Sequence, residues 1–216
     1  MSAVSKLSVM SVVVVCLSLT LNLTLAQGAG AQTATWTGPD PQRKVRLYGD
    51  AVYNLDYAMS EICMPWLLQD ADPLGFKRSG VVAARRPASE KALDQFAKRE
   101  VLSAWWVGSP NITVTLSRGV GKTERNCDVT VNRGEGSKLR EAMVARLAQW
   151  PHPMTRKYSQ PVTNYAQREL WCGTINEASD LALISSGGQK GFAALRATVW
   201  RQSPPDKDCQ SEPVVP

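Results

Sequence analysis

Residues 118–124, with the sequence RGVGKTE, come nearest in type and spacing to a nucleotide-binding signature. A phosphate loop has the form G-x-x-x-x-G-K-[ST] between a strand and a helix, so that backbone N–H groups and the helix N-terminus face the phosphates. Residues 121–123 (GKT) fit the end of this pattern, but Leu116 stands where its first glycine belongs. An alternating stretch typical of a strand follows from Asn126. The pattern therefore predicts a turn between two strands and no bound nucleotide.

Three cations would crowd one end of that hairpin, namely Arg118, Lys122 and Arg125. The glycines among them leave backbone N–H groups able to face a ligand, as in other anion-binding turns. These three residues are therefore a candidate anion site for a phosphorylated glycan, an acidic lipid head group or an acidic protein. The alternative is a solvated basic turn without a ligand, which is the ordinary state of surface arginines and lysines.

His152 is the only histidine in the chain, and the prolines on either side of it predict an exposed, stiff loop. A Ser-His-Asp or Cys-His enzyme would have to use this residue, but no G-x-S-x-G sequence is present to place a nucleophile. A single histidine excludes a zinc site built from several histidines, and no Gly-containing calcium loop occurs. We expect no metal and no cofactor. A hydrolase that uses His152, or carboxylates from distant positions, is the alternative that stays open.

The chain has five cysteines, of which Cys16 lies in the segment predicted to be removed on export. The other four predict two disulfides, because an even number of cysteines is typical of exported, disulfide-stabilised folds. No C-x-x-C sequence occurs, which argues against a zinc ribbon and a thioredoxin-type redox pair. Three pairings are possible. We favour Cys127–Cys172, since both lie in strand-like stretches, together with Cys63–Cys209, which would tie the C-terminal tail to the domain.

Residues 1–31 have the features of a cleaved signal peptide. Lys6 is followed by a mostly apolar run over residues 7–25, and residues 29–31 (AGA) form an A-x-A cleavage site. We place cleavage after the last of these alanines, with Ala26 as the second choice. A retained membrane anchor is the alternative, although serine and threonine residues dilute the apolar run. The mature chain is then expected in the periplasm or outside the cell, without a membrane span.

Three stretches have apolar residues at helical spacing. The first is residues 50–69, with Asp50 as the N-cap and Pro65 expected to end or kink the helix. The second is residues 89–106, and the third is residues 137–150. The sequence therefore predicts three helices.

Elsewhere apolar and polar residues alternate, which is the pattern of strands with one buried face. The predicted strands are residues 111–117, 126–132, 168–174, 181–186 and 192–201. Hairpin connections leave little room for the crossovers of a parallel sheet. The predicted fold class is α+β, with three helices packed on one face of a mainly antiparallel twisted sheet of about five strands, stabilised by disulfides. Residues 32–202 would form this single domain, without an internal repeat, and residues 203–216 a proline-rich tail.

The net charge favours anionic partners only modestly. The full chain carries a formal charge of +6, and loss of Lys6 with the signal peptide leaves +5 (6 − 1). Such an excess suits contact with an anionic surface but is not the footprint of a nucleic-acid-binding protein. Because the sequence has no cofactor motif, a single histidine and an even number of mature cysteines, the expected function is non-catalytic binding by a periplasmic binding or interaction protein. Its partner would be an acidic envelope component or another protein.

If residues 1–31 direct export, a reporter fused to residues 1–35 will cross the inner membrane, because the apolar run and the A-x-A site are both present. N-terminal sequencing of the mature full-length protein should then begin near Gln32. A cytoplasmic protein whose intact mass still includes residues 1–31 would contradict this expectation.

Overall fold

The computed structural model describes residues 36–47, 49–84, 99–119, 124–152, 154–175 and 178–205, together with Cys209. The predicted signal peptide, residues 1–31, lies outside the described residues. Of the predicted tail, residues 203–205 and Cys209 are described.

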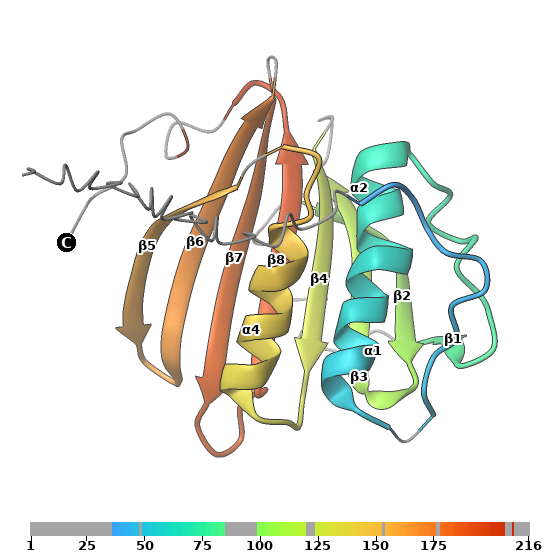
Figure 1. Cartoon of the computed structure of the whole chain (residues 1–216), viewed down its shortest axis with the longest axis horizontal. Helices are drawn as coiled ribbons and strands as arrows, with labels where there is room; N and C mark the ends of the chain where they lie inside the picture. The colour runs from blue at the N-terminus through green and yellow to red at the C-terminus, as the bar shows by residue number, and fades with distance from the viewer. Residues whose placement is uncertain are drawn as a thin grey trace, which may run out of the picture. The chain divides into compact units, whose positions relative to one another are not determined.

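Among the described residues, eight strands form one antiparallel sheet in the order β1-β2-β3-β4-β8-β7-β6-β5 (Figure 1). The strands are β1 (Val81–Ala83), β2 (Arg99–Val107), β3 (Ser109–Gly119), β4 (Arg125–Val131), β5 (Thr155–Val162), β6 (Tyr165–Ile175), β7 (Ala178–Gly188) and β8 (Leu195–Gln202). The order describes two four-stranded meanders, β1–β4 and β5–β8, joined where β4 pairs with β8. A helical segment precedes each meander, so the topology repeats within the chain although the sequence shows no repeat.

The first helical segment runs without a break through α1 (Ala51–Ala58), the π-helical turn η1 (Met59–Cys63) and α2 (Met64–Gln69). Asp50 caps it as predicted, since the Asp50 carboxylate accepts a hydrogen bond from the Val52 N–H at 2.9 Å. Pro65 does not end the helix. The Met64 N–H donates to Met59 O, five residues back, and this wider turn accommodates the proline that follows.

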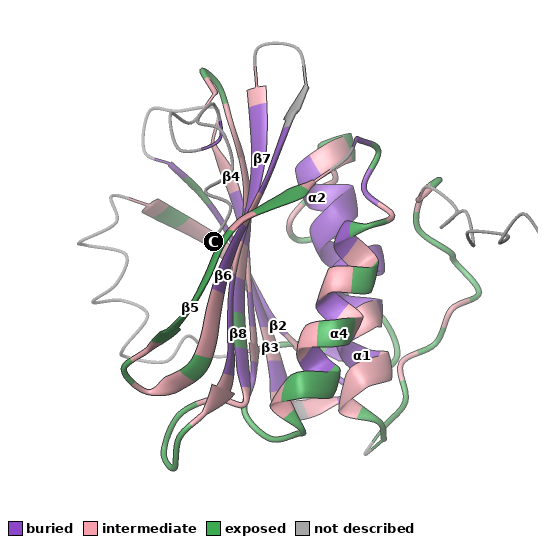
Figure 2. Ribbon diagram, turned by 60° about the vertical axis from the view of Figure 1, so that its left-hand side comes forward, coloured by how far each residue is buried: buried purple, intermediate pink, exposed green. Residues whose placement is uncertain are grey.

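The second helix, α4 (Gly136–Leu147), begins within one residue of its predicted start, and its apolar residues Leu139, Met143 and Leu147, which recur at helical spacing, are all buried. It packs on β7 and β8 and lies beside α1, which packs on β3 and β4. Both helical segments therefore cover the same face of the sheet, and buried residues concentrate between them and the strands (Figure 2). We call this the helix-covered face. No helix in the described ranges is long and apolar enough to cross a membrane.

The predicted fold class is wrong in its elements, because the sheet has eight strands and only two of the three predicted helices are present in the described residues. Of the predicted helix 89–106, residues 99–106 belong to strand β2, and residues 89–98 lie outside the described residues. The physical reason is visible in β2 itself. Val101, Trp105 and Val107 are strand formers, and pairing with β3 buries Trp105 and Val107.

The hairpin prediction for residues 118–125 is confirmed at its described ends. Strand β3 ends at Gly119, whose N–H donates to Glu124 O at 3.0 Å, and β4 begins at Arg125. No helix follows the turn, so the geometry of a phosphate loop is absent at this position. In the two strands themselves, the alternating residues Val114 and Val129 face the core as predicted.

Two disulfides form as predicted, but their predicted pairing is wrong. The predicted bonds were Cys127–Cys172 and Cys63–Cys209, whereas the observed bonds are Cys63–Cys127 and Cys172–Cys209, with Cα–Cα distances of 5.5 and 5.4 Å. Cys63 and Cys127 meet because the first helical segment packs directly on β4. Cys172 points to the opposite face of the sheet, since it alternates with Trp171 on β6, and it joins Cys209 there in a small cluster with Leu170 and Leu181.

Peptide mapping of the oxidised protein under non-reducing conditions should recover the linked pairs Cys63–Cys127 and Cys172–Cys209. Replacing either pair by alanines should lower the free energy of unfolding by roughly 2–4 kcal/mol, because each bond closes a long loop in the unfolded chain. Recovery of a Cys63–Cys209 peptide, or of free thiols in the native protein, would contradict the observed pairing.

Candidate functional site

Three arginines stand side by side in one row across the sheet. Arg118 of β3 is paired with Arg125 of β4, which is in turn paired with Arg201 of β8. Asp180 of β7 continues the row beyond Arg201. All four belong to the helix-covered face, because they alternate in phase with core residues such as Leu116. The row therefore brings cations from three neighbouring strands, about 5 Å apart, to the end of the sheet where α2 ends.

Each arginine of the row has a carboxylate partner. Arg118 Nε lies 2.9 Å from Glu100 Oε2, and both side chains are about half exposed. Arg125 Nη2 lies 2.6 Å from Asp70 Oδ1. Arg201 makes two hydrogen bonds to Asp180, of 2.6 and 2.8 Å. Each of the three guanidinium charges therefore has a carboxylate beside it. The three ion pairs differ in how far their side chains are exposed.

Arg125 also belongs to the C-terminus of α2. Its Nη1 donates to Trp66 O at 3.3 Å, in the last turn of the helix, and its partner Asp70 is the left-handed C-cap, with φ of 60°. A cation at this end is favoured by the unpaired carbonyls and the negative end of the helix dipole. The predicted anion site thus has a structural role at one of its three residues. Lys122, the third predicted member, lies outside the described residues.

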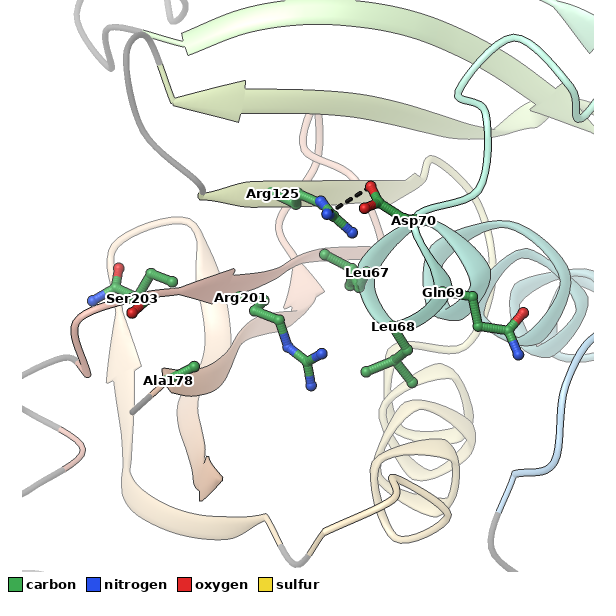
Figure 3. A pocket seen from close by; sticks show the side chains of 9 residues that line it. Leu67, Leu68, Gln69, Asp70, Arg125, Ala178, Arg201 and Ser203 are labelled. Atoms are coloured by element: carbon green, nitrogen blue, oxygen red, sulfur yellow. Dashed lines mark ion pairs between the residues drawn. The ribbon is translucent and has the colours of Figure 1, made fainter. Parts of the chain in front are cut away.

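Two open clefts flank the Arg125–Asp70 ion pair, which lines both of them. The basic cleft, of about 440 Å³, is lined by Leu67, Leu68, Gln69, Asp70, Arg125, Ala178, Arg201, Gln202 and Ser203. Figure 3 shows the guanidinium of Arg201 and the side chain of Leu68 projecting into this opening, with the ion pair beside it. The acidic cleft, of about 400 Å³, is lined by Trp66, Asp70, Ala71, Asp72, Pro73, Leu102, Arg118, Glu124 and Arg125.

The clefts differ in charge. Two arginines and one aspartate line the basic cleft, whereas three carboxylates and two arginines line the acidic cleft. Arg118 and Arg125 both line the acidic cleft, and Arg118 does not line the basic cleft. Because Lys122 lies outside the described residues, the predicted site Arg118, Lys122 and Arg125 stays a prediction. Arg201 takes a position beside Arg125 that was not predicted, because only the pairing of β4 with β8 brings the two residues together.

Asp180 is fully buried and gathers three side chains. It accepts hydrogen bonds from Arg201 and from Trp150 Nε1, the latter at 2.6 Å, and His152 Nε2 lies 2.7 Å from its Oδ2. Burial raises the pKa of Asp180, but the contacts from His152, Arg201 and Trp150 outweigh it and hold the pKa below its usual value. The carboxylate is therefore ionised at neutral pH and fixes Arg201 at the rim of the basic cleft.

The predicted exposure of His152 is wrong, because the ring is buried. Packing of the residues after α4 against the start of β7 places it beside Asp180. Its Nε2 approaches Asp180 closely, and its Nδ1 is buried with no hydrogen-bonding partner among the described residues. In the described part of the chain, therefore, no serine hydroxyl is bonded to this histidine in the arrangement that a Ser-His-Asp mechanism needs.

On the face opposite the helices, two buried polar side chains have no hydrogen-bonding partner in the described part of the chain. Ser117 Oγ and both polar atoms of the Asn126 amide are unbonded, although the residues are paired across β3 and β4. Nearby, burial raises the pKa of Asp128, which accepts a hydrogen bond from Thr198 Oγ1 at 2.5 Å.

For metals, the described residues contain no group of three or more His, Cys, Asp or Glu ligands placed to hold an ion.

Replacing Asp180 by asparagine should lower the free energy of unfolding at pH 7 by roughly 1–3 kcal/mol, because it removes a buried carboxylate and leaves the partly exposed Arg201 without its counter-charge. The lowered pKa of Asp180 means that its contribution is present above the unfolded-state value, about 3.9, and is lost as the pH falls through the folded-state pKa. Urea unfolding from pH 7 down to pH 2 measures both effects, and Asp72→Asn, at an exposed carboxylate, is the control. Equal pH dependence in Asp180→Asn and the unmodified protein would contradict the assignment.

Comparisons of the chain with protein-family models, curated proteins and solved structures found no match. What the clefts do must therefore be inferred from their own charges, contacts and exposure.

Proposed function

We propose that this protein is an exported, non-catalytic binding protein, periplasmic or extracellular, which takes an anionic group of its ligand into the basic cleft. The observation that carries the proposal is the placement of Arg125 and Arg201 on adjacent strands at the rim of one open cleft. Leu67 and Leu68 give the same cleft apolar walls. A few convergent charged groups against an apolar wall are the usual composition of a ligand site.

The two arginines differ in how firmly they are held. Arg201 is fixed by Asp180, whose side chain is 0% exposed. Arg125 is paired with Asp70, whose side chain is 74% exposed. An exposed ion pair contributes little, so a carboxylate or phosphate of the ligand can replace Asp70 on Arg125. Arg201 then supplies a positioned second charge, and Arg125 an exchangeable one.

An acidic partner outside the cytoplasm agrees with two other features of the chain, its disulfides and its net charge. Two disulfides are the bonds that an oxidising compartment outside the cytoplasm allows. The net positive charge favours approach to an anionic envelope surface. A phosphorylated glycan, an acidic lipid head group and an acidic protein all present the required anion, and binding to each can be measured separately.

A hydrolase is less well supported by the same contacts. Asp180 already accepts from Arg201 and Trp150 and is held ionised, so it is not a proton donor at neutral pH. His152 is buried against it and does not open onto either cleft. Turnover of an envelope substrate that is abolished by His152→Ala would favour the enzyme over the binding protein.

Inorganic phosphate and butyrate, titrated against the disulfide-bonded domain at low ionic strength, should shift the NMR signals of residues around Arg125. Arg125→Gln should weaken both anions by about fivefold or more, because it removes one of the two cations of the cleft. Added salt should weaken binding in the same way.

The matched control is Arg118→Gln, which removes an arginine of the same row that lines only the acidic cleft. Binding of these anions should change little in this variant. Anion binding that is equal in Arg125→Gln and the unmodified protein, or no binding to either, would refute the proposed site.

A further inference from the structure

The Arg125–Asp70 ion pair lies between a basic and an acidic cleft, and both of its residues line both clefts. A ligand that reaches across the pair would therefore meet an excess of positive charge on one side and of negative charge on the other. Arg125 shares the basic cleft with Arg201, and Asp70 shares the acidic cleft with Asp72 and Glu124. Glu124 is paired with Arg99 at 3.5 Å and is mostly buried. The acidic cleft thus offers Asp70 and Asp72 as its accessible carboxylates.

Asp72 is available to a ligand cation. Its Oδ1 accepts a hydrogen bond from the Leu74 N–H at 2.9 Å, which fixes the carboxylate in the turn after α2. No arginine or lysine among the described residues is paired with it, and the residue is exposed. Asp70 becomes available to a ligand cation when a ligand anion binds Arg125 in its place.

A ligand with one negative charge would disturb this arrangement. Its carboxylate would gain Arg125, but Asp70 would be left without a partner and close to the new negative charge. A ligand that also carries an ammonium group would supply that partner. The exchange then replaces one ion pair by two, without leaving a charge of the protein uncompensated.

We infer, building on the proposed anion site, that the ligand is zwitterionic. It is an amino acid, or a peptide-like group, whose carboxylate takes Arg125 and Arg201 in the basic cleft and whose ammonium takes Asp70 and Asp72 in the acidic cleft. The carboxylate and the ammonium of the ligand would then lie on either side of the position now occupied by the Arg125–Asp70 ion pair. Short flexible molecules with a carboxylate at one end and an amine at the other therefore match the two clefts together.

Three compounds of one size test this assignment: 4-aminobutyrate, butyrate and butylamine. Titrated at the same ionic strength and pH 7 into the disulfide-bonded domain, 4-aminobutyrate should bind about fivefold or more tightly than either of the others, since it alone makes both ion pairs. Extending the linker to 6-aminohexanoate should change the affinity, because the separation of the charges must match that of the clefts.

Asp70→Asn should reverse the preference. Arg125 loses its competitor in this variant, so butyrate should bind more tightly, while 4-aminobutyrate loses the carboxylate that receives its ammonium. Asp72→Asn should weaken 4-aminobutyrate and leave butyrate unchanged. Glu141→Gln, at an exposed carboxylate of α4 away from both clefts, is the control, and circular dichroism with thermal unfolding checks that each variant folds.

The outcomes separate this inference from the proposed function. Equal affinity for butyrate and 4-aminobutyrate, lost together in Arg125→Gln, would overturn the zwitterion and leave the anion site standing. Binding of butylamine as tight as that of 4-aminobutyrate would overturn it also, because the cleft would then select a cation. Failure of butyrate and phosphate to bind at all would remove the anion site and this inference together.

Discussion

Pairing of β4 with β8 is the interaction on which the rest of the structure depends. Each half of the chain alone would be one helical segment on a four-stranded meander, with a small core. The central pair joins the halves in a single register, in which Val129 lies opposite Ala197 in the middle of the core. The same register places Arg125 opposite Arg201 at one end. The core and the row of arginines are therefore two consequences of one strand pairing.

Carboxylate–arginine pairs then connect the elements around the joined sheet, helix to strand, helix to helix and strand to strand. Glu169 of β6 accepts two hydrogen bonds of 2.7 Å from Arg140 of α4, and Asp56 of α1 accepts from Arg146 of α4. Asp180 ties β7 to β8 in the same way, through Arg201. Such pairs add little net stability because each charge loses its hydration. They do favour one arrangement of the elements, because any other arrangement would separate the partners and leave a charge unpaired.

The sequence predicted best where burial on one face shaped the residues, and worst where pairing partners are far apart in the chain. Ile112, Val114 and Leu116 alternate because one side of β3 is core, and that strand was predicted. Strand β5 was missed because it lies at the edge of the sheet with most of its side chains exposed, and Lys157 and Pro161 give it the composition of a protected edge. No local pattern distinguishes such a strand from a loop.

Long-range pairing accounts for the errors at the candidate site as well. The disulfide partners were assigned from the type of element, but the packing of the helix on β4 decides that Cys63 meets Cys127. Arg125 was predicted from the turn before it, whereas its neighbour Arg201 comes from the last strand of the chain. His152 was expected to be exposed from its prolines, and the buried Asp180 overrides that local expectation.

The unequal burial of two otherwise similar ion pairs explains how one cleft can be both ordered and open to exchange. Separating Arg201 from Asp180 would leave a fully buried charge unpaired, at a cost of about 3–5 kcal/mol. Separating Arg125 from Asp70, which is largely exposed, costs on the order of 0–1 kcal/mol. A small ligand that makes a few polar contacts can offset the second cost but not the first. In the proposed mode of binding, exchange would therefore occur at Arg125, while Arg201 would keep its position through Asp180 and provide the fixed charge against which the ligand is oriented.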